Sequence, residues 1–431
     1  MKHKILIYSI LIFSFFSCQM DESQNFEVEK VNLEIALSEQ EVEILAEFRD
    51  SPISEIIPST NQIVLKFKEG IQEAEREALS NYHGAISRKK CSCTNGSNLY
   101  ELWTFDEEIN IEPKTGAIRD EGGLEFVAQN FSFTNSLQYL DGEPNWIELI
   151  DSNLNQDYIS KIVDVNQGIT IAVLDAGLDT NFHNAFSAKF LHNSDPGVCG
   201  ELSGWDFVDD DNNPFETFPY LHGTMVTYII HSELSKSNIN HNILPVRVAD
   251  AYGNASFFNI ICGLEYAIEK QANLINLSLG WYGNNTYADQ IISNLISNTS
   301  SIIVASAGNK GSDNDLVPHF PSNYAHDNVV AVASADLVSD NVAFYSNFGN
   351  TSVDFFANGN NYAFPLNGNS NLYFMNHGTS FATPFVTARA AEFLTYNGWP
   401  SNDMALRLAS ENSANSATHY TKPVVYSVII K

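Results

Sequence analysis

The sequence contains few basic residues. It has 22 Lys and Arg against 52 Asp and Glu in 431 residues, which gives a formal net charge of −30. Nucleic-acid binding relies on clustered Lys and Arg that neutralise phosphates, so this composition argues against a nucleic-acid partner. The same acidity disfavours adsorption to an anionic membrane surface. Because 44% of the residues are hydrophobic and only 17% are charged, the chain can still bury a sizeable core.

The N-terminal apolar run is short. It spans residues 5–16, follows Lys2 and Lys4, and ends at Ser17 and Cys18. A helix across a bilayer needs about 20 apolar residues, so this run indicates a secretory signal. A small residue followed by Cys resembles a bacterial lipoprotein signal, in which Cys18 becomes the lipidated first residue; ordinary cleavage and an uncleaved anchor are the alternatives. We expect an exported protein of the cell envelope or surface, or one secreted after processing, that touches the membrane only through a lipid.

Cysteine is scarce. Apart from Cys18 the chain has only Cys91, Cys93, Cys199 and Cys262, which is too few for a disulfide scaffold. Cys91 and Cys93 are too close for an easy mutual bridge, and no zinc-ligand spacing lies near them. The residues leave two alternatives, a bond between Cys199 and Cys262 or unpaired thiols.

Patterning divides the chain into five parts. Strand-like runs and one helical run between residues 61 and 130 predict a small α+β unit, and a turn-rich stretch at 141–145 separates it from the rest. The predicted parts are a signal at 1–18, an acidic tether at 19–60, the α+β unit at 61–130, a linker and processing region at 131–160, and a main domain at 161–431.

Strand and helix patterns alternate in the main domain. Its strand-like runs are nearly continuous in apolar residues, as is typical of strands buried on both faces. With helices between them, these runs predict an α/β domain on a mostly parallel, doubly wound sheet. The predicted strands are 169–174, 243–248, 274–277, 302–305 and 329–333, and the clearest helices are 259–271 and 287–298.

Three short segments place reactive side chains at strand ends or helix starts. Asp175 ends the run VLD, His222 begins a helical stretch in HGT, and Ser380 lies in GTSFATP. Each alone is ordinary, because such residues are common in turns, cores and N-caps. Together they fit nucleophilic catalysis, since a serine hydroxyl is a weak nucleophile until a neighbouring imidazole removes its proton.

The chain resembles the subtilisin-like serine proteases. Its Asp, His, Ser order is one of the known triad orders, and the resemblance implies a subtilisin-like α/β fold. It also implies Ser380 as nucleophile, His222 as general base and then acid, and Asp175 as the group that orients His222. Asn309 would donate to the oxyanion together with the Ser380 backbone N–H. The motifs that carry the resemblance are VLDAG (173–177), HGT (222–224), ILPVRVAD (243–250), NLSLG (276–280), ASAGN (305–309), FPSNY (320–324) and GTSFATP (378–384).

The resemblance further implies two backbone edges that hold an extended peptide substrate by main-chain hydrogen bonds. One edge is Gly253, Asn254 and Ala255. The other is Ser278, Leu279 and Gly280, which also walls the first specificity pocket. Ala307 and Gly308 are further residues expected to bind substrate. Because no carboxylate is placed at the base of that pocket, we expect broad specificity that leans towards apolar residues.

Five positions depart from the family pattern without removing a catalytic group. Ala176 lacks the hydroxyl that usually stands beside the catalytic Asp. The other departures are Met225, Tyr228, Asn358 and Phe385.

An acidic stretch, Asp206–Asn213, packs four carboxylates into eight positions. Such oxygen ligands suit a structural calcium ion, with Asp209 and Asp211 as candidate ligands. A solvated loop that caps its own backbone explains the stretch equally well. The chemistry itself requires no cofactor.

The α+β unit resembles, through IVLKFKEG (63–70), the propeptide that templates and inhibits these proteases until it is cleaved, here in roughly 130–145. An independent accessory domain is the alternative. The sequence thus predicts an exported serine endopeptidase (EC 3.4.21.-), made as a zymogen, whose partners are peptide or protein substrates and its own propeptide. A catalytically inactive surface binding module of the same fold is one alternative. A lipase or esterase is another, although Ser380 lacks the GxSxG context of that class.

Overall fold

The computed structural model describes most of the chain from residue 55 onwards. The described residues are 55–94, 99–106, 110–135, 145–148, 168–178, 199–200, 204–215, 221–283, 285–337, 340–360, 362–365, 372–397, 403–418, 420 and 422–430. The signal, Cys18 and nearly all of the tether lie outside them, as does most of the 131–160 linker.

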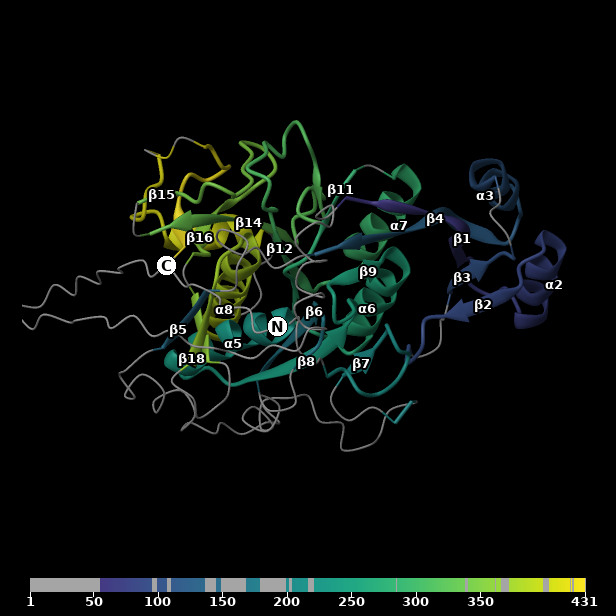
Figure 1. Ribbon diagram of the computed structural model, residues 1–431, viewed down its shortest axis with the longest axis horizontal. Coiled ribbons are helices and arrows are strands. Elements are labelled where there is room, and N and C mark those ends of the chain that lie inside the picture. The colour runs from purple at the N-terminus through teal and green to yellow at the C-terminus, as the bar shows by residue number, and fades with distance from the viewer. Residues whose placement is uncertain are drawn as a thin grey trace, which may run out of the picture.

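The N-terminal domain is an antiparallel sheet with two helices, which forms one end of the molecule (Figure 1). Its core is built from alternate residues of its strands, including Ile63, Leu65 and Trp103, all fully buried. The domain begins earlier and ends later than the predicted 61–130. Its elements are β1 (Ile57–Phe67), α2 (Glu73–His83), β2 (Ser87–Lys90), β3 (Tyr100–Thr104), α3 (Ile111–Arg119) and β4 (Leu124–Thr134).

The main domain is built on a sheet whose strands run parallel except at one short edge element. The strand order is β19-β16-β14-β12-β10-β6-β8-β7, with β15 antiparallel to β14. These strands are β6 (Ile169–Asp175), β7 (Trp205–Asp206), β8 (His241–Arg247), β10 (Leu274–Leu277), β12 (Ile302–Ser306), β14 (Val329–Asp336), β15 (Asn341–Val342), β16 (Phe355–Asn358) and β19 (Ile429–Ile430).

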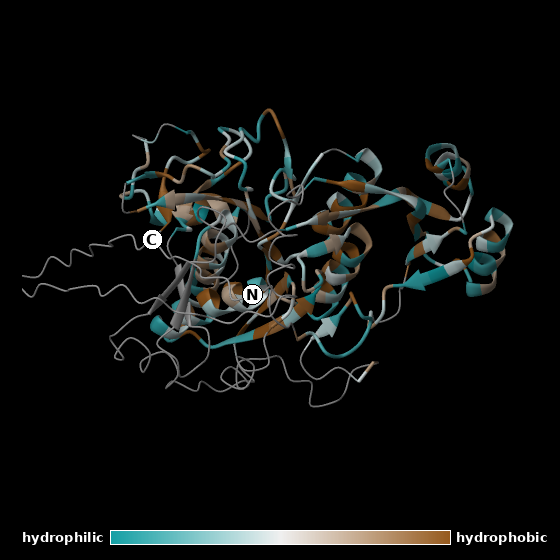
Figure 2. Cartoon of the chain, viewed as in Figure 1, coloured by the Kyte–Doolittle hydropathy of each residue, from teal (hydrophilic) through white to brown (hydrophobic). Residues whose placement is uncertain are grey.

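Helices cover both faces of this sheet. Ala172 and Leu174 of β6 pack with α6 and α7, whereas Ile171 and Val173 pack on the other face with α5 and α8. Hydrophobic residues gather in the central strands and on these helices, while α2 of the N-terminal domain is mostly hydrophilic (Figure 2). The helices are α5 (His222–Lys236), α6 (Phe257–Glu269), α7 (Thr286–Ser297), α8 (Thr379–Asn397) and α9 (Met404–Glu411).

This arrangement is the predicted subtilisin-like α/β fold. All five predicted parallel strands are present to within two or three residues at each end. No helix in the described ranges is long and apolar enough to cross a membrane. The remaining short strands are β5 (Asn145–Glu148), β9 (Asn254–Ser256), β11 (Trp281–Tyr282), β13 (His319–Phe320), β17 (Tyr362–Pro365) and β18 (Leu372–Asn376).

The N-terminal domain joins the main domain through a strand. β4 pairs antiparallel with β9, so that the N-terminal sheet has the order β2-β3-β1-β4-β9 and its last strand belongs to the main domain. β4 also packs on α6 and α7. In this contact Phe131 of β4 stacks on Phe257 of α6, with ring centroids 4.8 Å apart.

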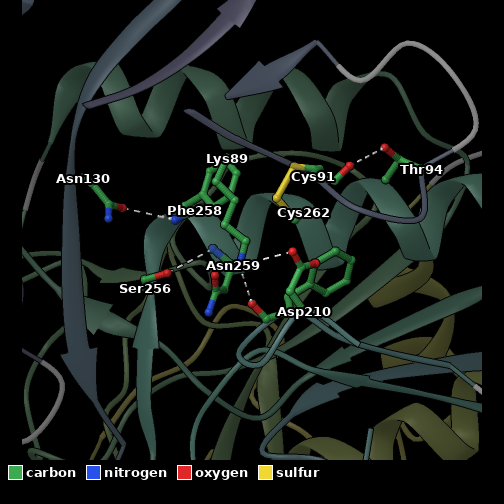
Figure 3. The surroundings of a disulfide bond; sticks show 10 residues. Lys89, Cys91, Thr94, Asn130, Asp210, Ser256, Phe258, Asn259 and Cys262 are labelled. Carbon is green, nitrogen blue, oxygen red and sulfur yellow. Dashed lines mark hydrogen bonds and ion pairs between the residues drawn. A yellow bond between two sulfur atoms is a disulfide. The ribbon is translucent and has the colours of Figure 1, made fainter. Parts of the chain in front are cut away.

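The cysteine pairing predicted from the sequence was wrong. Cys91 is bonded to Cys262 (Figure 3) and Cys93 to Cys199, so both disulfides join the two domains. Among the four cysteines that the structure describes, neither a Cys199–Cys262 bond nor an unpaired thiol occurs. The reason is that the N-terminal sheet docks against α6, which brings the segment after β2 onto a helix that is far away in sequence.

Candidate active site

Asp175 lies at the carboxyl end of β6, in the middle of the parallel sheet. It is 2% exposed, and its carboxylate accepts a hydrogen bond from the Ala176 backbone N–H at 2.8 Å. His222 is the first residue of α5 and is 4% exposed. Gly223 allows this helix start to lie against the turn after β6, because a Cβ there would stand 2.2 Å from the Gly177 carbonyl oxygen.

Asp175 and His222 form a buried pair. Nδ1 of His222 lies 2.9 Å from both carboxylate oxygens of Asp175. A carboxylate can only accept a hydrogen bond, so Nδ1 carries the ring proton and donates a hydrogen bond to Asp175. Nε2 is then the ring nitrogen that can act as a base. This is the orientation that a serine-activating histidine needs.

Ser380 is the second residue of α8, and the ring of the following residue, Phe381, lies 5.5 Å from the His222 ring between centroids. The exit of β10 is tied to this helix start, because the Ser278 hydroxyl donates to the Ser380 carbonyl oxygen at 2.8 Å. At the positive end of the helix dipole, the Ser380 N–H faces an environment that favours negative charge.

Asn309, just beyond β12, is held by the same helix start. Its Oδ1 accepts from both the backbone N–H and the hydroxyl of Thr379, each at 2.9 Å. The Nδ2 group of the same amide lies 3.4 Å from where a Cβ on Gly378 would stand. The same Cβ position lies 3.7 Å from the Ser380 backbone N, so the two predicted oxyanion donors both border Gly378.

Comparison with known proteins identifies the family to which the chain belongs. Residues 166–424, which contain Asp175, His222, Asn309 and Ser380, match the family described as "Subtilase family". The chain belongs to the subtilase family.

Individual subtilase relatives agree. The chain is 28% identical over 361 residues to the "Thermophilic serine proteinase" of Bacillus sp. (strain AK1), which covers 82% of each protein. It is 32% identical over 257 residues to "Thermitase" of Thermoactinomyces vulgaris, covering 58% of this chain and 81% of that protein. Among solved structures, a "cold adapted subtilisin-like serine proteinase" is 25% identical, covers 62% of this chain and 90% of that chain, and has a TM-score of 0.47.

One predicted substrate edge of this subtilase is already paired. Asn254 and Ala255 lie in β9, opposite Thr134 and Phe133 of β4, and the Gly253 carbonyl accepts from Asn135 N–H at 2.8 Å. The N-terminal domain therefore occupies the edge that the resemblance assigns to a peptide.

The second predicted edge leaves the sheet beside the triad. Ser278, Leu279 and Gly280 follow β10, and Ala307 and Gly308 follow the neighbouring β12. Gly308 N–H donates to the Thr379 hydroxyl at 3.1 Å. The structure thus brings the four residues predicted to form the triad and the oxyanion site, and both strand exits, together at one end of the sheet.

The departures from the family pattern leave the site intact. In place of a side-chain hydroxyl at Ala176, its backbone N–H bonds to Asp175. Met225 is buried in the core between the sheet and α6, while Tyr228 and Phe385 are partly buried against the core clusters. Asn358 ends β16, and its side chain accepts from the Asn360 N–H.

The acidic stretch is organised around an arginine. Arg247 forms ion pairs with Asp206 and with Asp209, the latter at 2.6 Å. Asp211 accepts from the Asn213 N–H at 2.8 Å, as in a self-capped turn. Within the described ranges, no group of three or more His, Cys, Asp or Glu side chains is placed to hold a metal ion.

Three parts of the site were not foreseen from the sequence. Thr379 lay inside a quoted motif, but its role in holding Asn309 had not been assigned. His319 and Tyr282, described below, lie beside the strand exits; His319 stands one residue before the FPSNY motif. The position of the Thr379 hydroxyl directly before the predicted nucleophile was a signal that could have been used. Nothing in the local sequence marks His319 or Tyr282.

Proposed function

We propose that this subtilisin-like serine peptidase is an exported endopeptidase that cleaves peptide bonds through an acyl-enzyme on Ser380. The observation that carries the proposal is the buried pair of His222 and Asp175, with Nδ1 at 2.9 Å from both carboxylate oxygens, beside the helix start that holds Ser380. The proposed steps need only these side chains and backbone donors.

In the first step His222 Nε2 takes the hydroxyl proton of Ser380 as its Oγ attacks the peptide carbonyl carbon. The oxyanion that forms is stabilised by Asn309 Nδ2 and the Ser380 N–H. His222 then gives the proton to the leaving amine, and the peptide bond breaks. Water, deprotonated by the same Nε2, hydrolyses the ester and regenerates Ser380. Asp175 keeps the ring in the required tautomer and stabilises the imidazolium.

Labelling with a fluorophosphonate probe tests this mechanism. We expect labelling of the processed protein, its loss in Ser380→Ala, and hydrolysis of casein in parallel. An unlabelled processed protein would favour the inactive binding module, and turnover of a p-nitrophenyl ester without casein hydrolysis would favour the esterase.

The N-terminal domain is proposed to be an inhibitory propeptide. Its β4 occupies the predicted substrate edge at β9 and packs on α6 and α7, which supports this role. The relative from strain AK1 aligns over 82% of this chain, and so beyond residues 166–424. Mass spectrometry of wild type beside Ser380→Ala tests autocatalytic processing in the linker, because identical processing of both would contradict it.

Export through a lipidated Cys18 is also a proposal, carried by the sequence alone. We expect the chain in the membrane fraction and Cys18→Ser in the soluble fraction. A protein that is soluble with Cys18 intact would contradict lipidation.

Structural calcium at Asp209 and Asp211 is the remaining proposal. The ion pair between Asp209 and Arg247 already neutralises one of the two candidate ligands. A rise in melting temperature on adding calcium, reversed by EDTA and absent in Asp211→Asn, would support calcium, and an unchanged melting temperature would contradict it.

A further inference from the structure

Both disulfides cross the junction that processing would open. Cys91 lies just beyond β2 of the N-terminal domain and is bonded to Cys262 of α6, 171 residues later. Cys93 is bonded to Cys199, 106 residues later. The predicted linker at 131–160 lies inside both loops, so cutting it separates two chains that each disulfide still joins.

The surroundings of these bonds hold the domains together. Cys91 and Cys262 are 0% and 1% exposed, and the Cys91 carbonyl accepts from the Thr94 hydroxyl at 3.1 Å (Figure 3). Lys89 of β2 reaches across to the catalytic domain, where its Nζ lies 3.4 Å from the Phe207 carbonyl oxygen. On the far side of the junction Asn130 of β4 accepts from the Phe258 N–H of α6 at 3.3 Å.

We propose that the processed protein is a covalent two-chain molecule, in which the N-terminal domain remains attached to the catalytic domain through Cys91–Cys262 and Cys93–Cys199. This rests on the proposed processing of the linker. Hydrolysis adds one water across one peptide bond and leaves both S–S bonds unchanged. The inhibitory strand then stays at the high local concentration of a tethered ligand, and a lipid on Cys18 would hold both chains.

Separation of the chains requires a reductant. Each disulfide takes two electrons and two protons, which a dithiol supplies while it is itself oxidised to a disulfide. Because the Cys91–Cys262 sulfurs are buried between the domains, attack by a thiolate depends on opening of the junction. Processing alone therefore does not release the N-terminal domain.

The test makes the cut independent of the protein's own activity. A recognition site for a sequence-specific protease is inserted between residues 136 and 144 of the Ser380→Ala chain, which is then cut and run on denaturing gels. We expect one band at the mass of the uncut chain without reductant and two bands with dithiothreitol. The matched control, with Cys91→Ser and Cys93→Ser added, gives two bands under both conditions.

Two bands from the cysteine-containing chain without reductant would overturn the proposal. Since Ser380 is absent, this result says nothing about peptidase activity, and the two proposals can fail separately. If the control with Cys91→Ser and Cys93→Ser does not fold, the cut chain with all its cysteines still tests the proposal, because its bands are compared with and without dithiothreitol.

Two rings lie against the exits of β10 and β12, which are the predicted walls of the first specificity pocket. A Cβ on Gly280 would stand 2.3 Å from Cε1 of His319. A Cβ on Gly308 would stand 2.6 Å from the Tyr282 hydroxyl and 2.9 Å from Cδ2 of His319. His319 and Tyr282 are paired between β13 and β11, with ring centroids 4.7 Å apart in an edge-to-face arrangement.

Neither ring is free to swing out. They are 2% and 6% exposed, the Tyr282 hydroxyl accepts from Asn347 Nδ2 at 2.8 Å, and His319 Nδ1 lies 3.3 Å from the Ser322 hydroxyl. Burial lowers the pKa of His319 to about 3, so its ring is neutral at working pH and offers no charge to an acidic substrate side chain.

We infer that His319 and Tyr282 close the first specificity pocket, so that the residue before the cleaved bond must be small, such as Ala, Ser or Gly. This rests on the proposed function and replaces the expected broad specificity that leans towards apolar residues. The pocket is closed by neutral, apolar ring faces, so size rather than charge limits the substrate.

Peptide p-nitroanilides that differ only in having Ala or Phe before the cleaved bond test this inference. We expect wild-type kcat/KM for Ala to exceed that for Phe by about a hundredfold, in the range that steric exclusion from a pocket gives. His319→Gly should shift the Phe-to-Ala ratio upwards by about tenfold or more, which corresponds to about 1.4 kcal/mol. His326→Gly, a partly buried histidine bonded to Ser293, is the matched control and should leave the ratio unchanged.

A wild-type preference for Phe would overturn the closed pocket, whatever the variants do. Fluorophosphonate labelling of the same samples distinguishes this from failure of the proposed function. A labelled enzyme with the wrong preference contradicts only the pocket, whereas an unlabelled one contradicts the peptidase mechanism.

Discussion

Phe133, near the end of β4, is the antiparallel partner of Ala255 in β9, and its side chain is fully buried. Its ring lies 5.2 Å from that of Trp281, between centroids. A residue of the N-terminal domain thus fills an apolar site on the catalytic domain while its backbone occupies the predicted substrate edge. Inhibition by this domain should depend on that side chain.

We expect Phe133→Ala to weaken the binding of β4 to the predicted substrate edge at β9. Truncation of a buried Phe costs about 3–5 kcal/mol, part of which is lost from the contact between the domains. The rate at which a fluorophosphonate labels Ser380 in the unprocessed protein should therefore rise by about tenfold or more. Phe126→Ala, on the same strand but only partly buried, is the control, and equal rates in both variants would contradict the prediction.

The oxyanion donor should depend on Thr379. Its hydroxyl donates to Asn309 Oδ1 at 2.9 Å and accepts from Gly308 N–H at 3.1 Å. Thr379→Val removes both bonds while keeping the shape, so kcat should fall with little change in KM. Since loss of a whole oxyanion donor costs about 10²–10³ in kcat, the fall should be smaller than that of Asn309→Ala.

Steady-state kinetics on one peptide substrate checks this, with Thr379→Ser as the variant that restores the hydroxyl. A raised KM at constant kcat in Thr379→Val would show that the residue acts in substrate binding instead.

Asp175→Asn should preserve the fold and remove most of the activity. The amide would still lie beside His222 Nδ1 but favours the other tautomer, in which Nε2 carries the proton and cannot accept one. The reduction in kcat expected for this exchange in a serine triad is about 10⁴-fold. The melting temperature should change little in comparison, and retention of more than about a tenth of the activity would contradict the assigned role.

The stability of the catalytic domain should fall as pH rises through neutrality because of Asp354. Its carboxylate accepts from Ala331 N–H at 2.7 Å, and burial raises its pKa to about 7. A carboxyl whose folded pKa lies above its unfolded value stabilises the fold fully below about pH 4 and loses that contribution as pH rises through about 7.

Asp354→Asn keeps a neutral acceptor at every pH. In the Ser380→Ala background, the free energy of unfolding should decline less between pH 5 and 8 in this variant, by roughly 2 kcal/mol. Urea unfolding at several pH values measures it, with the exposed Asp327→Asn as control. Parallel pH profiles for Asp354→Asn and its parent would contradict the prediction.

Local pattern was sufficient for much of the catalytic domain. The five buried strands were predictable because a strand covered on both faces is an apolar run of fixed length, whichever partner it finds. Asp175, His222 and Ser380 could be proposed as catalytic because each lies in a short motif at a strand exit or helix start, and the family resemblance added Asn309; these roles remain predictions. The limits of the N-terminal domain were less accurate, since the first and last residues of β1 and β4 are set by pairing with other strands.

The sequence by itself therefore determined the fold class and the order of the strands along the chain, because each depends on neighbours within a few positions, and its short motifs predicted the catalytic residues. Only the tertiary structure decided which cysteines are bonded, which side chains lie between the exits of β10 and β12 and which strand lies on the predicted substrate edge. Cys91 and Cys262, or Phe133 and Ala255, meet because two domains dock, and that docking depends on the shapes of surfaces assembled from distant segments. No window of the sequence contains both partners, so the contact exists only once the chain has folded.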